Sequence, residues 1–223
     1  MTALFTYYLI IEVTCLVASV IFLWREPHTV WRLHPWYLLV VVLTEFTGTY
    51  LTHTADAPNQ WVYNLYLFVI PIFLGLVLYH IIHALTPIRR RWLYGWWVVC
   101  LVVYVAETWA TGGISVYNKY TRYFVNGGIS VACAYYFVQQ YRIPGYRNLK
   151  ASPDFWWLYG TCCFYIGQGI ITLFSRPLSH PGAIILGIPL YKILYFILTY
   201  SLYGLWSYAY YLRWHTRQRS SNS

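Results

Sequence analysis

Seven long hydrophobic stretches constrain the fold of this 223-residue chain more than any other feature. Only 9% of the residues are charged, whereas a soluble domain has about 25%. About 20 apolar residues in a helix cross the hydrocarbon core of a bilayer. We therefore expect an all-α polytopic membrane protein, a bundle of seven transmembrane helices. The expected spans are residues 2–24, 36–52, 61–83, 92–111, 120–141, 155–174 and 184–211.

The connections are short, so residues 1–223 should form a single seven-helix transmembrane domain that ends in a short basic cytoplasmic tail at 212–223. The N-terminus lacks the basic region of a secretory signal, and we interpret the first stretch as a retained helix. Five cysteines lie within apolar stretches, which argues against an extracellular disulfide framework. We expect localisation in a membrane of the bacterial inner (plasma) type.

The basic residues set the expected orientation, with the N-terminus outside and the C-terminus cytoplasmic, because inner loops are enriched in Lys and Arg. In that orientation the inner segments hold Arg25, Arg32, Arg89, Arg90, Arg91, Arg142, Arg147, Lys150, Arg213, Arg217 and Arg219, and the outer segments hold Lys119, Arg122 and Arg176. The net charge of +9 therefore favours contact with anionic lipid headgroups, and we expect no nucleic-acid partner.

Each stretch also carries a strongly polar residue in its expected outer half. A charged side chain at a helix centre costs roughly 2.5–3.5 kcal/mol on insertion scales, so a common depth favours a shared purpose. Counting ~1.5 Å per residue from the outer ends places these residues ~5–15 Å deep. They are Glu12, Glu45, Asn64, Glu107, Asn126, Gln168 and Lys192. We predict that they line one outward-facing pocket for a small polar ligand or ion.

The inner halves of these stretches are mostly apolar, which predicts a packed plug beneath the pocket. A conducting pore would need polar side chains along its whole length, so the pattern counts against an open channel. Several tyrosines also fall within the stretches, where a phenol needs a hydrogen-bond partner. These are Tyr63, Tyr66, Tyr104, Tyr165, Tyr195 and Tyr200.

Lys192 is the most informative of the seven polar residues. We place it about eight residues into the last stretch, ~12 Å deep, where it should need a carboxylate partner. The candidates are Glu12, Glu45 and Glu107. Burial and repulsion among three carboxylates should hold at least one of them in its neutral form. Pro189 should kink the last helix just before Lys192.

The seven helices, the outside N-terminus and a lysine in the last helix resemble the outline of the microbial rhodopsins. This resemblance implies a retinal-type chromoprotein in which Lys192 forms the Schiff base. The chain departs from that family in two ways: residues 61–83 contain no carboxylate, and the lysine follows Gly187-Ile-Pro-Leu-Tyr without an Asp. Apart from retinal, the sequence indicates no cofactor.

The main functional prediction is a sensor or receptor, or a gated transporter, with a ligand pocket. The sequence has no nucleophile elbow, phosphate-binding loop, dinucleotide fingerprint or zinc motif, so we expect no metal site and favour a non-enzymatic role. A membrane-embedded enzyme using Glu45, His53 and Glu107 remains an alternative. Another is a structural subunit, in which the polar set only ties helices together within a homo-oligomer or against a partner membrane protein.

Overall fold

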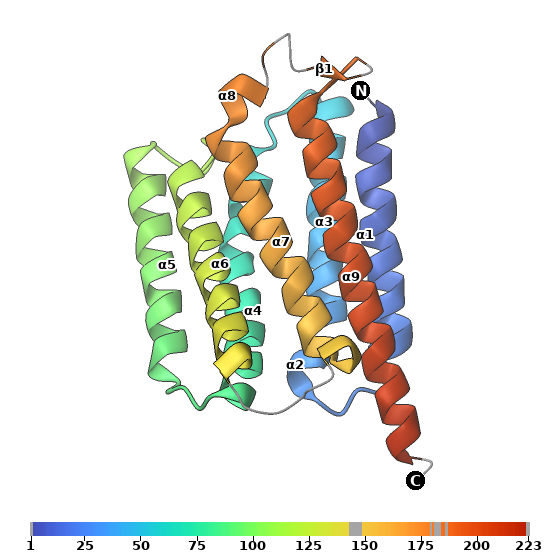
Figure 1. Cartoon of the computed structure of the whole chain (residues 1–223). Helices are drawn as coiled ribbons and strands as arrows, with labels where there is room; N and C mark the ends of the chain where they lie inside the picture. Colours follow the sequence, from blue (N-terminus) through green and yellow to red (C-terminus); the bar gives the residue numbers. More distant parts are fainter. Residues whose placement is uncertain (1, 143–148, 179, 181–183, 186, 222–223) are drawn as a thin grey trace.

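The computed structural model is an all-α bundle of seven long helices (Figure 1), which confirms the predicted fold class at that level. The structure describes residues 2–142, 149–178, 180, 184–185 and 187–221. The long helices are α1 (Thr2–Leu23), α3 (His34–His53), α4 (Gln60–Leu85), α5 (Arg91–Ala110), α6 (Lys119–Arg142), α7 (Pro153–Leu173) and α9 (Leu190–Ser221). Six of them begin and end within about two residues of the sequence prediction, because the apolar runs themselves mark the helices.

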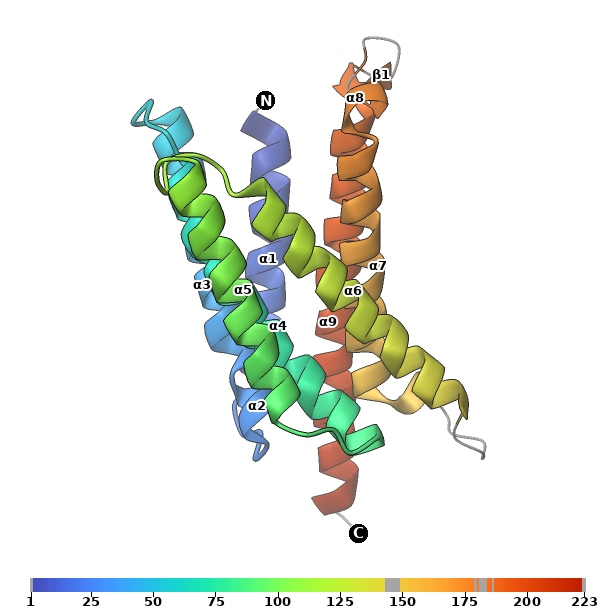
Figure 2. The same ribbon diagram turned by 90° about the vertical axis from the view of Figure 1, so that its left-hand side faces the viewer.

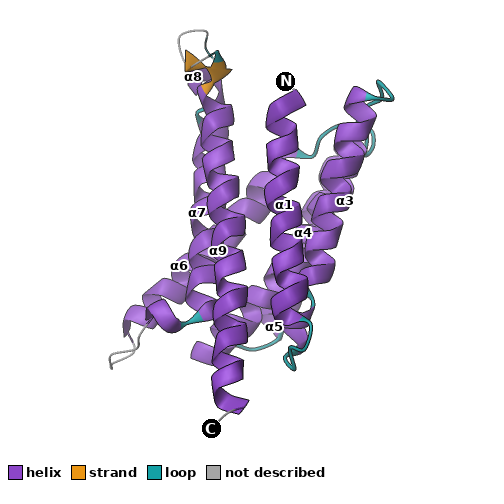
Figure 3. Ribbon diagram, turned by 90° about the vertical axis from the view of Figure 1, so that its right-hand side faces the viewer, coloured by secondary structure: helices purple, strands orange, loops and turns teal. Residues whose placement is uncertain are grey.

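The last helix differs most from the prediction. Residues predicted as its first turns form a small antiparallel hairpin of β1 (Ile184–Ile185) and β2 (Ile188–Pro189) at the upper end of the bundle (Figure 3). Gly187, between the strands, has φ 76°, a conformation that glycine adopts at little cost. Because Pro189 lies in β2, the predicted proline kink in the last helix is wrong. The helix continues through Ser221, so the predicted tail is helical from residue 212 to 221.

Three short helical segments complete the described structure. They are α2 (Thr29–Arg32), the 3-10 turn η1 (Leu149–Ala151) and α8 (Ser175–Leu178). The first two lie near the lower end of the bundle and α8 near the upper end (Figure 1). The N-terminus is at the upper end and the C-terminus at the lower end, as an odd number of antiparallel helices requires.

Six of the long helices form a closed ring. Neighbours in contact run in the order α1, α3, α4, α6, α7 and α9, and α9 returns to α1. The seventh, α5, packs outside this ring against α4 and α6 (Figures 1 and 2). A ring of this kind directs one stripe of each helix inward and can enclose a central space.

Two helices, α4 and α5, are long and apolar enough to cross a membrane, and the apolar part of α1 is shorter. Their most apolar windows differ in burial: 56% of the residues are buried in α4 and 17% in α5. The difference follows from their positions, since α4 belongs to the ring and α5 lies outside it. Most apolar side chains of α5 therefore face away from the protein.

Fully buried aromatic residues fill the lower part of the ring. This group, here called the aromatic plug, consists of Trp31, His34, Trp157, Trp206 and Tyr210, each at most 1% exposed. The His34 ring stacks on Trp31 with centroids 4.8 Å apart, and Trp157 stacks on Trp206 at 5.1 Å. Trp206 Nε1 donates to the Trp157 carbonyl at 3.2 Å, which joins α9 to α7. A packed region below the polar residues was predicted, but not the histidine within it.

An ion-pair network holds the lower half of α9 against the segment between α1 and α2. Glu26 is only 3% exposed and accepts from Arg213 Nη2 at 3.0 Å and from Arg217 Nη1 at 3.3 Å. The Arg213 guanidinium also lies 4.8 Å from the Trp31 ring centroid. Two arginines that the sequence analysis assigned to lipid headgroups therefore have an anionic partner within the protein.

Replacing Glu26 with Gln should lower the free energy of unfolding by about 1–3 kcal/mol, because two charge-assisted hydrogen bonds lose their anion. Denaturant unfolding of the detergent-solubilised protein measures this change. Asp56→Asn is the control, since Asp56 is exposed and its φ of 45° is one that Asn tolerates. Equal stability of the two variants would show that the network contributes nothing.

Candidate functional site

The six-helix ring encloses a cavity of about 560 Å³ with residues from every ring helix in its wall. It extends from Lys192 in the first turn of α9 to Trp206 in the aromatic plug. Fourteen residues of helix separate these two, which corresponds to ~21 Å along α9. The volume falls within the roughly 300–1,000 Å³ of small-molecule sites.

Five of the seven predicted polar residues line this cavity. They come from five different helices and are Glu12 (α1), Glu45 (α3), Asn126 (α6), Gln168 (α7) and Lys192 (α9). Asn126 Nδ2 donates to Gln168 Oε1 at 2.6 Å and joins α6 to α7 across the wall. Counting residue depth thus brought together Glu12, Glu45, Asn126 and Gln168, which are up to 156 positions apart in the sequence.

Asn64, the first of the two predicted residues that do not line the cavity, is fully buried and fixes the loop between α5 and α6. Its Nδ2 donates to the carbonyls of Ile114 at 2.8 Å and Val116 at 2.7 Å, and its Oδ1 accepts from the Asn118 amide at 3.0 Å. All three partners belong to the loop backbone. Asn64 therefore supports the fold, and its place in the predicted pocket is wrong.

Glu107 holds the other end of the same loop and also lies outside the cavity wall. Its carboxylate accepts from the amides of Tyr120 at 2.8 Å and Thr121 at 2.6 Å, and from the Thr121 hydroxyl at 2.7 Å. These amides open α6, where a helix leaves donors unpaired and favours a negative charge. Glu107 is thus a capping residue, and the loop it fixes carries Tyr117 into the cavity wall.

Nine tyrosines form much of the cavity wall, namely Tyr8, Tyr37, Tyr63, Tyr66, Tyr117, Tyr165, Tyr191, Tyr195 and Tyr203. The hydroxyls of Tyr37 and Tyr66 lie 2.8 Å apart and share a hydrogen bond. Four of the six tyrosines that the sequence analysis singled out are in this set, and Tyr104 and Tyr200 are not. Tyr200 instead donates to the Tyr7 carbonyl at 3.1 Å. The wall is therefore aromatic but carries many hydroxyl groups.

Glu45 has a tyrosine partner that depends on a glycine. Tyr63 donates to Glu45 Oε2 at 3.2 Å, from α4 to α3. Tyr63 passes directly over Gly48, where an added Cβ would lie 2.7 Å from the phenol oxygen. Gly48 is one turn from Glu45 on the same face of α3. The small residue thus leaves room for the hydroxyl to reach the carboxylate.

Lys192 does not pair with a carboxylate, and the predicted lysine–glutamate ion pair is wrong. In the described structure its ammonium group has no carboxylate within 4.0 Å, and this holds for Glu12, Glu45 and Glu107. The hairpin before α9 explains this, because it places Lys192 in the first turn rather than eight residues into a helix. Its ammonium lies 6.0 Å from the Tyr191 ring centroid, and its carbonyl accepts from the Tyr8 hydroxyl at 3.1 Å.

Arg122 is a cavity residue that the sequence analysis assigned only to an outer segment. It lies in the first turn of α6, and its guanidinium donates to the Tyr117 hydroxyl and lies over the Tyr117 ring. Burial raises the pKa of the Tyr117 phenol, which keeps this partner neutral. The spacing of four residues between Arg122 and Asn126 places both on one helix face and could have revealed it.

The cavity wall thus includes two acidic side chains, Glu12 and Glu45, and two basic side chains, Arg122 and Lys192. None of them forms an ion pair with another within 4.0 Å in the described structure. Glu12 is only 5% exposed, and its Oε2 has no hydrogen-bond partner among the described residues. An unpaired buried carboxylate oxygen is costly, so its presence in a cavity wall favours a binding role.

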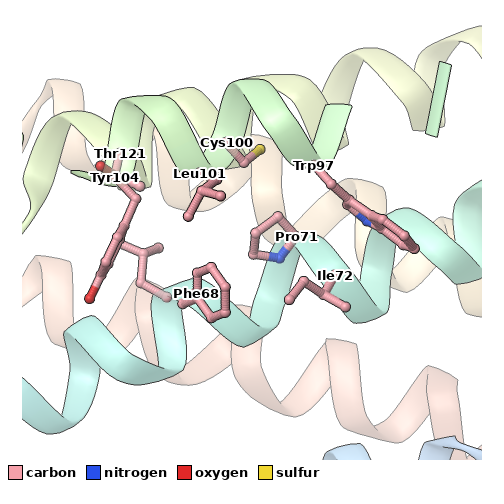
Figure 4. A pocket seen from close by; sticks show the side chains of 9 residues that line it. Phe68, Pro71, Ile72, Trp97, Cys100, Leu101, Tyr104 and Thr121 are labelled. Atoms are coloured by element: carbon pink, nitrogen blue, oxygen red, sulfur yellow. The ribbon is translucent and has the colours of Figure 1, made fainter. Parts of the chain in front are cut away.

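A second hollow, between α4 and α5, is too small for a ligand (Figure 4). Its volume is about 10 Å³, room for a single water at most, and Phe68, Pro71 and Leu101 are among its mainly apolar lining. No group of three or more His, Cys, Asp or Glu residues in the described ranges could hold a metal ion. The large cavity is therefore the candidate site.

No family model, curated protein or solved structure matches this chain.

Replacing Glu107 with Ala should lower the free energy of unfolding by about 1–3 kcal/mol, because two backbone amides and the buried Thr121 hydroxyl lose their acceptor. Amide hydrogen exchange at Tyr120 and Thr121 should accelerate at least tenfold, whereas exchange at the middle of α9 should change much less. Unchanged exchange at these two amides would contradict the capping role.

Proposed function

We propose that this chain is an integral membrane protein that binds a small polar organic ligand in the six-helix cavity. The proposal rests on four acidic and basic side chains in the cavity that do not pair with one another. Burying such groups in an apolar bundle costs free energy, and a bound ligand that pairs with them offsets this cost. Ligand binding is the first step of either a receptor or a gated transporter.

The outer surface supports the membrane location. Large apolar side chains are exposed on several helices, including Ile21 (62% exposed), Val102 (59%) and Val131 (70%). Only 17% of the most apolar window of α5 is buried. Lipid accommodates such a surface better than water does, and helices satisfy their own backbone hydrogen bonds in a bilayer. In this proposal all seven long helices cross a membrane of the bacterial inner type, with the N-terminus outside.

The aromatic plug favours a binding site with one entrance over an open channel. Its five residues are almost completely buried and join α3, α7 and α9 to the segment around α2. The cavity wall, in contrast, reaches the upper end of the bundle at Lys192 and Tyr117. We propose that ligand enters from that end, which faces outward in the proposed orientation. Transport would require the plug to rearrange.

Two alternatives lose support. A retinal chromoprotein needs a lysine with a nearby counterion, whereas Lys192 lies in the first turn of α9 without a carboxylate within 4.0 Å. The suggested enzyme residues do not share one site, because Glu107 caps α6 and only Glu45 of the three lines the cavity. Ligand binding, in contrast, requires only residues that line the cavity together.

Full-length protein in lipid nanodiscs should be thermally stabilised by some members of a library of small polar metabolites of every charge class. Glu45→Gln and Val41→Trp should weaken the binding of those compounds at least tenfold, by removing a charge and by filling the cavity. Val102→Trp is the control, because Val102 lies outside the ring on α5 and does not line the cavity.

Stabilisation by the same compounds in both cavity variants, or by none in the wild-type protein, would contradict the proposed function. A separate measurement with liposomes containing the protein distinguishes a transporter from a receptor. Accumulation of a bound compound inside the vesicles indicates transport, and saturable binding without accumulation indicates a receptor.

A further inference from the structure

We infer that the ligand is a zwitterion, with an ammonium group bound at Glu12 and Glu45 and an anionic group bound at Arg122 near the cavity entrance. This inference rests on the proposed function and specifies the chemical class of ligand that the cavity accepts. It follows from where the two signs of charge lie in the wall and from the partners that each charged group lacks.

The acidic side of the cavity comes from two adjacent ring helices, α1 and α3. Glu12 and Glu45 both line the cavity, and neither has a cationic partner within 4.0 Å in the described structure. Glu12 Oε2 is buried without a hydrogen-bond partner among the described residues. A cation near the two side chains would stabilise their ionised form and satisfy this oxygen. Tyr203, which also lines the cavity, supplies a further hydroxyl group.

Aromatic rings in the lower part of the cavity favour an organic ammonium ion. Tyr37, Tyr66, Tyr203 and Trp206 line the cavity, and the Tyr37 and Tyr203 rings pack against Trp206 of the aromatic plug. The faces of Tyr and Trp rings attract ammonium groups, and this attraction is stronger where water is excluded. A bare metal ion would instead need several oxygen ligands in a compact shell. The described residues here provide only two carboxylates, so an organic cation fits the wall better.

Arg122 lies across the ring from Glu12. Arg122 is on α6, which is three positions from α1 in the six-helix ring and therefore opposite to it. The only described hydrogen-bond partner of its guanidinium is the neutral Tyr117 hydroxyl, so donors of this group remain for a ligand. A guanidinium matches a carboxylate in a bidentate geometry. Lys192 adds a second positive charge at the same end.

Helix positions place the two sides at different depths. Glu12 lies about ten residues from the upper end of α1, ~15 Å along the helix, and Arg122 lies about three residues from the start of α6, ~5 Å. The ammonium group of the ligand should therefore point toward the aromatic plug and its anionic group toward the entrance. A ligand with one charge would leave the opposite side of the cavity unpaired.

The test compares probes with closely similar hydrocarbon parts that carry an ammonium group, a carboxylate or both, measured by isothermal titration with the full-length protein in nanodiscs. One set is L-phenylalanine, 2-phenylethylamine and 3-phenylpropionate. The other set is 6-aminohexanoate, hexylamine and hexanoate. In at least one set the zwitterion should bind at least tenfold tighter than the amine and the acid.

Two variants assign each charge to its side of the cavity. Arg122→Gln should weaken binding of the zwitterion and of the acid at least tenfold and leave the affinity for the amine within about threefold. Glu12→Gln should weaken binding of the zwitterion and of the amine at least tenfold and leave the affinity for the acid within about threefold. Retained binding of the amine by Arg122→Gln, and of the acid by Glu12→Gln, shows that each variant is folded. Lys119→Gln is the matched control for Arg122, since Lys119 lies in the same turn of α6 and outside the cavity wall.

An amine or acid that binds as tightly as the zwitterion in each set that binds would overturn the inference, as would zwitterions that do not bind at all. If library compounds of another charge class still bound to the cavity and required Glu45, only the zwitterion inference would be wrong, and the proposed function would stand. If the library also contained no compound that required Glu45, the proposed function itself would be wrong.

Discussion

The cost of holding acidic and basic side chains inside an apolar helix bundle governs this structure. Glu12, Glu45, Arg122 and Lys192 point into one space and do not neutralise one another directly. Tyrosine hydroxyls moderate the cost, as Tyr63 does for Glu45 and Tyr117 for Arg122. The space remains open because six helices form a closed ring and the aromatic plug fills only its lower part.

Most of the fold, and the main part of the candidate site, could be predicted from the sequence. Long apolar runs identify helices directly, and the depth of polar residues brought Glu12, Glu45, Asn126 and Gln168 together. The error for Lys192 has a local cause, since a two-stranded hairpin of apolar residues cannot be distinguished from a helical turn by hydrophobicity alone. Depth also cannot separate an inward-facing polar residue from one that holds a loop, and this explains Glu107.

The α5–α6 loop connects the structural residues to the candidate site. Asn64 and Glu107 fix its backbone, and the loop in turn places Tyr117 beside Arg122 at the entrance. Side chains outside the cavity therefore determine the geometry of its entrance. At the lower end, the Glu26 network holds α9 next to the plug, so the same helix carries Lys192 at the entrance and Trp206 at the floor.

In the proposed function the cavity opens to the outer side of the membrane, so a single cysteine placed in the cavity should react with a reagent applied from that side. Thr199 lines the cavity below the entrance, and Thr199→Cys can be made in a chain whose five native cysteines are replaced. A membrane-impermeant thiol reagent applied to intact cells should label this cysteine. It should not label a Val102→Cys variant, because Val102 lies on the face of α5 that points away from the ring and toward lipid in the proposed orientation. Labelling of Thr199→Cys only from the cytoplasmic side, or from neither side, would contradict the account.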